Sequence, residues 1–156
     1  MPRKRYISST GHVKVKRMIG CEFCNFGEPA KTKGTKGYLK TGDVCPRCSS
    51  PTLRLFDSNA EFKRAVELKQ LRDDNKIFDL EFQPRYPLHA PAQNNTTVHL
   101  YDFVADFSYH DEEQNCFIVE DVKGASGGQA IVTDVAKMKI AHFEAEYGQD
   151  VLITTR

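Results

Sequence analysis

The chain has 156 residues, of which 40% are hydrophobic and 28% are charged, so it can bury one ordinary core and a small satellite module. No apolar run approaches the roughly 20 residues that a membrane-spanning helix needs. The first residues, Met-Pro-Arg-Lys-Arg, lack the apolar segment of a secretion signal. We therefore expect a cytoplasmic protein without a membrane partner.

The net charge of +1 conceals an uneven distribution of charge along the chain. Residues 1–55 contain 12 Lys and Arg but 3 Asp and Glu, whereas residues 56–156 contain 10 and 18. A basic segment joined to an acidic remainder indicates contact with a polyanion such as nucleic acid. The alternative is a solvated basic tail without a specific role.

Four of the five cysteines form two matched C-x-x-C pairs, Cys21 with Cys24 and Cys45 with Cys48, separated by twenty residues. This spacing is typical of a four-cysteine zinc site. The alternatives are two disulfides, which are disfavoured inside cells, or four free thiols. Because four thiolates would fill a tetrahedral zinc ion, we predict a structural metal rather than a catalytic one.

The stretch between the two cysteine pairs is basic and rich in glycine, running from Lys31 to Gly37, and Tyr38 follows it. Lysines can contact phosphates, and an aromatic ring can stack on a base. We therefore expect residues 1–54, a basic arm and a zinc ribbon, to contact nucleic acid or a protein. The fifth cysteine, Cys116, starts a predicted buried strand and is expected to be an inert core residue.

The secondary structure after the zinc module follows from periodicity and helix caps. We predict strands at Leu53–Phe56, Ile77–Phe82 and Val98–Phe103, extended chain at Gln83–Leu88, helices over about 59–74 and 134–147, and a final strand at Val151–Thr154. The strands between Ile77 and Tyr109 are expected to form an antiparallel meander.

Glu61 has two predicted roles at the start of the first helix. Ser58-Asn-Ala-Glu61 has the form of a capping box, in which the glutamate bonds the backbone amide of Ser58. The same carboxylate could instead face a metal ion.

Glu81 and Gln83 share a predicted strand face that could reach the same metal ion, and a solvated strand face is the alternative.

Charged residues interrupt two largely apolar predicted strands, Val104–Tyr109 and Phe117–Gly124. Asp106 lies within the first strand, whereas Asp121 and Lys123 close the second and, being two residues apart, point to one face. Two acids and a lysine at adjacent strand ends can hold a hard divalent cation beside a water molecule. This pattern predicts a metal-dependent phosphodiesterase site.

Four blocks of sequence occur in a fixed order over residues 55–155: Phe56-Asp-Ser-x-x-Glu61, Leu80-Glu-Phe-Gln-Pro-Arg-Tyr-Pro-Leu88, Val104-Ala-Asp-Phe-x-Tyr109 and Val119-Glu-Asp-Val-Lys-Gly124. Together they resemble a phage-encoded branch of the PD-(D/E)XK nuclease superfamily, which shares its core with Holliday-junction resolvases and restriction endonucleases. The resemblance implies an α/β, restriction-endonuclease-like core over residues 55–156, with a mixed central sheet flanked by helices. The zinc ribbon lies outside it.

The resemblance also implies a role for each matching residue. Asp106 matches the first metal-binding acid, although Ala105 precedes it where the motif has proline. Asp121 matches the second acid and Lys123 the lysine of the motif. Glu61 matches a metal-binding acid on the first core helix, and Lys139 a lysine on the helix after the motif.

The function expected from this resemblance is magnesium- or manganese-dependent hydrolysis of DNA that leaves 5′-phosphate and 3′-hydroxyl ends. Branched DNA, as cut by resolvases, is one candidate substrate, and the sequence leaves a four-way junction, a flap, a nick and a specific site as alternatives. The backbone carbonyl of Val122 would join the two acids as a ligand. Resolvases work as dimers, so a homodimer is an expected partner state. The alternative function is a zinc-ribbon module that binds nucleic acid or a host protein, such as a polymerase, on a scaffold that does not cut.

Overall fold

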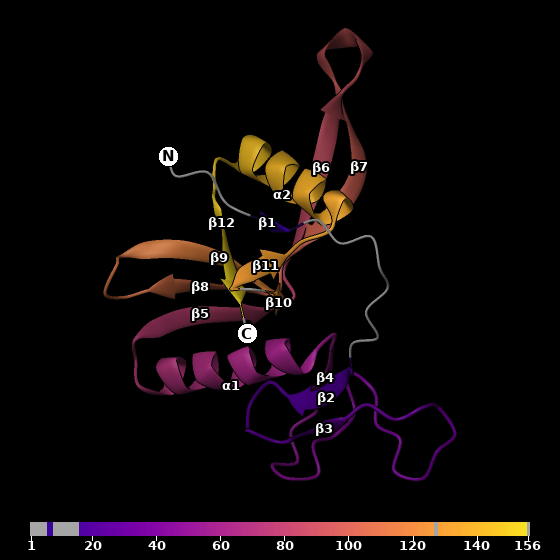
Figure 1. The fold of residues 1–156 in the computed structure, drawn as a ribbon. Coiled ribbons are helices and arrows are strands. Elements are labelled where there is room, and N and C mark those ends of the chain that lie inside the picture. Colours follow the sequence, from indigo (N-terminus) through magenta and orange to yellow (C-terminus); the bar gives the residue numbers. More distant parts are fainter. Residues whose placement is uncertain (1–5, 8–15, 127, 156) are drawn as a thin grey trace. The chain divides into compact units, whose positions relative to one another are not determined.

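The computed structural model describes residues 6–7, 16–126 and 128–155 (Figure 1). The fold is mixed α/β, as expected, and divides into two compact units: Met1–Gly11 with Ile77–Arg156, and His12–Lys76. None of the helices in the described part combines the length and apolar character needed to cross a membrane. The two units are described below one at a time.

The smaller unit, which we call the ribbon unit, contains a three-stranded antiparallel sheet and one helix. Its strands are β2 (Met18–Cys21), β3 (Gly27–Pro29) and β4 (Leu53–Phe56), in the order β3-β2-β4, and its helix is α1 (Asn59–Asp73). The predicted helix start is confirmed, since the Ser58 hydroxyl accepts a hydrogen bond from the Glu61 amide at 3.0 Å.

Helix α1 packs on the strands of the ribbon unit through an aromatic contact. Phe62 meets Phe56 edge to face, with ring centroids 5.5 Å apart. The Phe62 ring also lies directly over Gly20 and Gly27, where an added Cβ would come within 2.5 and 2.1 Å of it. The compact unit therefore includes α1 with the cysteine module, whereas the expected division fell after residue 54.

The larger unit, which we call the core unit, is built on a mixed four-stranded sheet. Its strands are β5 (Ile77–Phe82), β8 (Phe107–Asp111), β9 (Cys116–Lys123) and β12 (Val151–Thr155), in the order β12-β9-β8-β5. Strands β12 and β9 are parallel, and the other neighbours are antiparallel. Each predicted strand in this sheet is present, and the β8–β9 hairpin turns at residues 112–115, as its polar sequence indicates.

The expected three-stranded meander is wrong, because β6 (Arg85–Pro91) and β7 (Thr97–Val104) form a separate two-stranded sheet. A turn that includes the 3₁₀ helix Gln93–Asn95 connects them. Gln83 has a φ of +51°, a left-handed conformation that a regular strand does not contain. The chain therefore leaves the four-stranded sheet at Gln83-Pro84 and returns to it at Asp106.

The core unit also contains a small three-stranded sheet and a second helix. Strand β11 (Gln129–Ile131) pairs in parallel with β1 (Tyr6–Ile7) and antiparallel with β10 (Ala125–Ser126). Helix α2 (Asp134–Tyr147) begins after an N-cap at Thr133 and ends at Gly148, whose φ is +64°. Both ends lie where the caps predict them.

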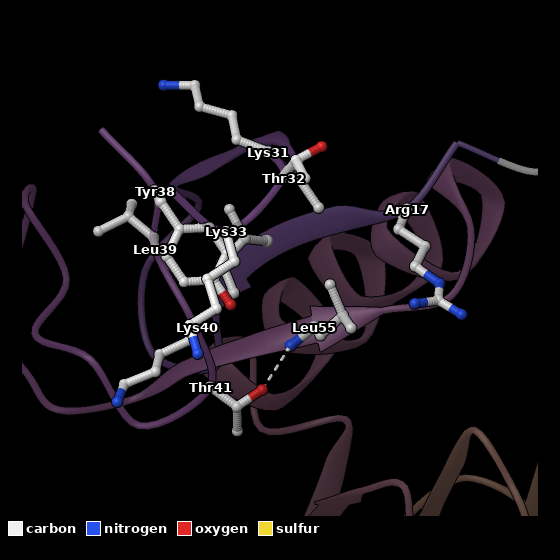
Figure 2. A pocket seen from close by; sticks show the side chains of 11 residues that line it. Arg17, Lys31, Thr32, Lys33, Tyr38, Leu39, Lys40, Thr41 and Leu55 are labelled. Carbon is white, nitrogen blue, oxygen red and sulfur yellow. Dashed lines mark hydrogen bonds between the residues drawn. The ribbon is translucent and has the colours of Figure 1, made fainter. Parts of the chain in front are cut away.

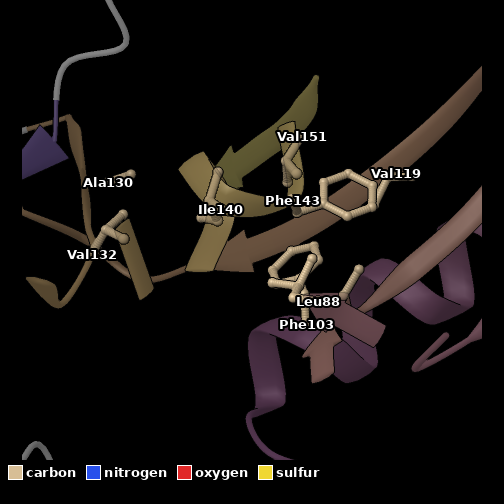
Figure 3. Packing of buried hydrophobic residues seen from close by; sticks show 9 residues of the cluster. Leu88, Phe103, Val119, Ala130, Val132, Ile140, Phe143 and Val151 are labelled. Atoms are coloured by element: carbon tan, nitrogen blue, oxygen red, sulfur yellow. The ribbon is translucent and has the colours of Figure 1, made fainter. Parts of the chain in front are cut away.

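Helix α2 supplies Ile140 and Phe143 to the main apolar cluster of the core unit (Figure 3). The other buried members come from β6, β7, β9, β11 and β12 and from the residues that follow β7 and β11: Leu88, Phe103, Ala105, Val119, Ala130, Val132 and Val151. The cluster thus joins the separate hairpin to the main sheet through α2.

Two expectations about individual segments change with the structure. Cys116 is exposed at the start of β9 rather than buried, because the hairpin end of that strand faces solvent. In the basic arm, Tyr6–Ile7 form a strand with β11, and residues 1–5 and 8–15 lie outside the described residues.

Candidate functional site

The four paired cysteines converge on one point in the ribbon unit. All four Sγ atoms lie within 4.8 Å of one another, and the distances from Cys21 to Cys48 and from Cys24 to Cys45 are both 3.6 Å. Four sulfurs placed tetrahedrally at about 2.3 Å from a zinc ion would be about 3.8 Å apart. The separations exclude disulfides and fit a four-coordinate metal, so this cluster could hold an ion such as zinc.

The backbone around the cluster favours thiolates at two of the four positions. The amides of Phe23 and Cys24 donate to Cys21 Sγ at 3.3 Å. Burial opposes ionisation of Cys21, but the hydrogen bond from Thr52 and these amides lower its pKa overall. Hydrogen bonds from the Ser50 backbone and hydroxyl lower the pKa of Cys48 to about 6.

A lysine that the sequence analysis missed lies directly behind the cluster. Lys69 of α1 is 1% exposed, and its Nζ donates to the carbonyl oxygens of Cys21 at 2.8 Å and Cys24 at 2.6 Å. Burial lowers its pKa, and the two cysteines partly offset that effect. The available signal was its place in the apolar stripe of α1, beside Leu68, where a lysine needs a buried partner.

In the core unit, the candidate acids lie where the two strand pairs meet. Asp106 occupies the break between β7 and β8, and its Oδ2 accepts a hydrogen bond from the Val122 amide at 2.5 Å. Its own amide donates to the Glu120 carbonyl at 3.0 Å, and its carbonyl accepts from the Gln83 amide at 2.9 Å. The interruption of the ladder therefore fixes the Asp106 carboxylate beside β9.

Asp121 and Lys123 share one face of β9, as their spacing predicts. Asp121 is 4% exposed, and its Oδ2 lies 2.7 Å from Lys123 Nζ. A carboxylate this deeply buried needs a partner to remain ionised, and the ammonium supplies one. The end of β9 thus presents a paired charge beside the strand break that holds Asp106.

The acid before Asp121 has a different environment on the opposite face of β9. Glu120 is fully buried, and its Oε2 accepts a hydrogen bond from the Tyr109 hydroxyl at 2.7 Å. The alternation of the strand therefore separates two adjacent carboxylates into a structural one and a candidate site residue.

One protein family, described as "Protein of unknown function (DUF1064)", matches residues 52–155. The chain belongs to the DUF1064 family. No curated protein and no solved structure matches it. The DUF1064 region contains Glu61, Asp106, Asp121 and Lys123, whereas all four clustered cysteines precede it.

Within the DUF1064 region, Glu61 has the structural role that its capping box predicts. Its Oε2 accepts a hydrogen bond from the Asp57 amide at 2.7 Å, one residue before the amide expected from the motif. Glu61 is 2% exposed and belongs to the ribbon unit, whereas Asp106, Asp121 and Lys123 belong to the core unit. Its contact with a metal remains a prediction.

The two remaining candidate residues of the DUF1064 protein lie on either side of the acids in sequence. Gln83 follows the end of β5 in a bend, rather than sharing a strand face with the exposed Glu81, and its backbone amide donates to the Asp106 carbonyl. Lys139 of α2 places its Nζ 5.1 Å from the centre of the Tyr101 ring. This cation–π contact with β7 gives Lys139 a structural role.

Proposed function

We propose that the chain is a metal-dependent DNA endonuclease with a restriction-endonuclease-like core. The observation that carries the proposal is the arrangement at the end of β9. Asp106 is held by the Val122 amide, and Asp121 is paired with Lys123 two residues further along the strand. The four-stranded sheet has both parallel and antiparallel neighbours, and the proposed core has a mixed sheet of this kind.

The donor atoms offered by Asp106 and Asp121 are of the kind that magnesium and manganese prefer, since all are oxygens. Among the described residues, only the cysteines bring three or more ligating groups within 4.8 Å of one another. Two carboxylates are sufficient for magnesium, because this ion keeps several waters and binds substrate phosphates directly. The carbonyl of Val122 is the proposed third protein donor. A bound ion would polarise the scissile phosphate and activate a water molecule.

Lys123 is proposed to act in the reaction directly, without the metal ion. Its ammonium, held by Asp121, would orient the attacking water and offset the negative charge that builds on the phosphate in the transition state. Asp121 therefore acts both as a metal ligand and as the group that aims Lys123. In-line attack would leave 5′-phosphate and 3′-hydroxyl ends.

The four-cysteine cluster is proposed to hold structural zinc. With four thiolates as ligands, such a site has no open position for a substrate. The basic residues of the zinc ribbon that precede α1 would then contribute salt-dependent affinity for DNA, because each phosphate contact releases counterions.

The decisive experiment incubates the protein with branched, single-stranded and linear duplex DNA in the presence of magnesium or manganese. Asp121→Asn and Lys123→Gln should each lower the cleavage rate by at least about 10²-fold, the usual contribution of a positioned acid–base group, and DNA binding should survive. Asp79→Asn, at a side chain that is 74% exposed, is the matched control. If either variant cuts as fast as the parent, the site assignment is wrong.

A second candidate function rests on the basic surface of the ribbon unit, which includes Arg17, Lys33 and Lys40. In this alternative the ribbon binds nucleic acid or a host protein such as a polymerase, and the core is a scaffold that does not cut. Stoichiometric binding of such a partner without cleavage of any substrate in the panel would favour it over the nuclease.

A further inference from the structure

An open groove of about 650 Å³ lies in the ribbon unit (Figure 2). Its walls come from β2, β4 and the two loop segments 30–33 and 38–41. Its volume lies within the roughly 300–1,000 Å³ range of pockets that hold small ligands. The side chains that matter for its chemistry are Arg17, Lys31, Lys33, Tyr38, Leu39 and Lys40.

The groove is strongly basic. Four cationic side chains line it, and none of its lining residues is acidic. Lys31 is paired with Glu28 at 3.3 Å, and Arg17 lies 3.8 Å from Asp57. In the described part of the chain, neither Lys33 nor Lys40 has a carboxylate within 4.0 Å of its ammonium. Cations gathered in a concave surface focus the potential that attracts an anion.

The groove also has an aromatic and apolar component. Tyr38 is 37% exposed, and Ile19, Leu39 and Leu55 line the groove with it. The loop that carries Tyr38 is fixed at two points. The Tyr38 amide donates to the Thr35 carbonyl at 3.0 Å, and the Thr41 hydroxyl accepts from the Leu55 amide at 3.1 Å (Figure 2). The backbone that carries Tyr38 is therefore ordered beside the groove, and β4 anchors the loop through Thr41.

We propose that this groove binds single-stranded DNA, with one base stacked on Tyr38 and the neighbouring phosphates on Lys33 and Lys40. Unpaired bases expose the faces that an aromatic ring and an apolar floor can cover, whereas the bases of a duplex are already stacked on one another. The identification of the polymer as DNA rather than RNA rests on the proposed nuclease function. The groove itself does not depend on cleavage.

The test measures the binding of a fluorescein-labelled 12-nucleotide oligothymidylate to the zinc-loaded Asp121→Asn protein without magnesium or manganese. A 12-base-pair duplex and a 12-nucleotide oligouridylate are measured in parallel. Because this protein cannot cleave under these conditions, failure of binding is separate from failure of the nuclease proposal. We expect the single-stranded DNA to bind more tightly than the duplex and the RNA.

Two substitutions separate stacking from charge in this assay. Tyr38→Ala should weaken binding about 5- to 150-fold, the loss expected when one base stack is removed, and Tyr38→Phe should stay within about twofold of the parent because it keeps the ring. Lys33→Gln and Lys40→Gln should each reduce the slope of log Kd against log salt concentration by about 0.7. Lys63→Gln, on the exposed face of α1, is the charge-matched control and should change nothing.

Zinc content and amide spectra of each variant establish that the ribbon unit is folded before binding is compared. Three results would overturn the proposal. They are tighter binding of the duplex than of the single strand, equal affinity of Tyr38→Ala and the parent, and a Lys63→Gln effect as large as that of Lys33→Gln. Tighter binding of the oligouridylate would assign the groove to single-stranded RNA instead.

Discussion

The ribbon unit and the core unit are held together in different ways. In the ribbon unit, one apolar cluster has four buried members, and two of them are Cys21 and Cys45 of the four-cysteine cluster. The core unit buries a larger cluster of aliphatic and aromatic side chains that contains no cysteine. If the cysteine cluster holds zinc, as proposed, the stability of the ribbon unit depends on that metal, whereas the apolar cluster of the core unit contains no metal-binding cysteine.

The two candidate metal sites differ in how many ligands the chain supplies. The cysteine cluster offers four protein ligands, so the chain alone defines its geometry. At the proposed site at the end of β9, the chain would contribute Asp106, Asp121 and the Val122 carbonyl, and water and substrate would fill the remaining positions. A closed site stabilises a fold, whereas a site completed by its substrate can do chemistry on it.

Removal of zinc should produce the largest effect and the sharpest separation of the units. Structural zinc contributes about 10–16 kcal/mol of apparent binding free energy in small modules, so a zinc chelator or Cys45→Ser should unfold the ribbon unit. Hydrogen exchange should accelerate in β2, β3 and β4 but stay slow in β8 and β9. Cys116→Ser, at the exposed fifth cysteine, is the control. Simultaneous unfolding of both units would contradict the prediction that only the ribbon unit depends on zinc.

Lys69→Met should have the next largest effect, and only on the ribbon unit. The substitution keeps the length of the side chain but removes the two hydrogen bonds to the carbonyls of Cys21 and Cys24. Loss of such a supporting contact typically lowers metal affinity about 10- to 100-fold. Competition with a chromogenic zinc chelator measures the change, and Lys63→Met is the exposed control on the same helix. Unchanged zinc affinity would mean that Lys69 only fills space.

Substitution of Glu61 separates its cap from its predicted metal contact. Glu61→Gln keeps an oxygen for the Asp57 amide, so unfolding free energy should change by less than about 1 kcal/mol, whereas Glu61→Ala should lose about 1–3 kcal/mol. If the carboxylate also binds a catalytic metal, both variants lose cleavage. Cleavage by Glu61→Gln at the parent rate would exclude the metal contact and leave helix capping as the role of Glu61.

The smallest predicted effect lies in the core unit and depends on pH. The hydrogen bond from the His89 amide to Glu146, followed by that from the His89 ring, lowers the pKa of this carboxyl below its usual 4.5. This contribution to stability is therefore fully present above pH 4.5 and is lost as pH falls through the lowered pKa. The difference in urea midpoint between the parent and Glu146→Gln, followed by NMR of α2, should shrink below pH 4.5.

Glu113→Gln is the control for this pH experiment because Glu113 lies in the exposed hairpin turn after β8. The NMR signals of α2 are the appropriate probe because acid also protonates the cysteines and releases zinc from the other unit. A midpoint difference that is independent of pH between 3 and 7 would contradict the assigned role of Glu146.

The elements that local chemistry determines could be predicted closely from the sequence. Helix α1 begins after Ser58 and α2 ends before Gly148, as their caps indicate. The separate β6–β7 sheet could not be predicted, because the left-handed Gln83 that divides the strands is not a glycine or asparagine. The exposure of Cys116 could not be predicted either, since strand composition does not say which end of a strand is buried.

The candidate sites were predictable to different degrees. Spacing alone indicated the cysteine cluster and placed Asp121 and Lys123 on one face. It could not give Asp106 its position in the strand break, because that position depends on long-range bonds to Glu120 and Val122. Lys69 was missed because its carbonyl partners lie more than 40 residues away in sequence.

The parallel pairing of β12 with β9 also bears on when the proposed site forms during folding. Strand β9 can pair with β8 through a short hairpin, but its second neighbour follows only after β10, β11 and α2, with Thr155 opposite Lys123. Hairpins close in about 1–10 μs, whereas non-local parallel pairing is slow because a long loop must be ordered first. A chain that has formed only the β8–β9 hairpin would hold Asp121 and Lys123 in water. Burial of that pair, on which the proposed activity depends, therefore follows from completion of the whole unit.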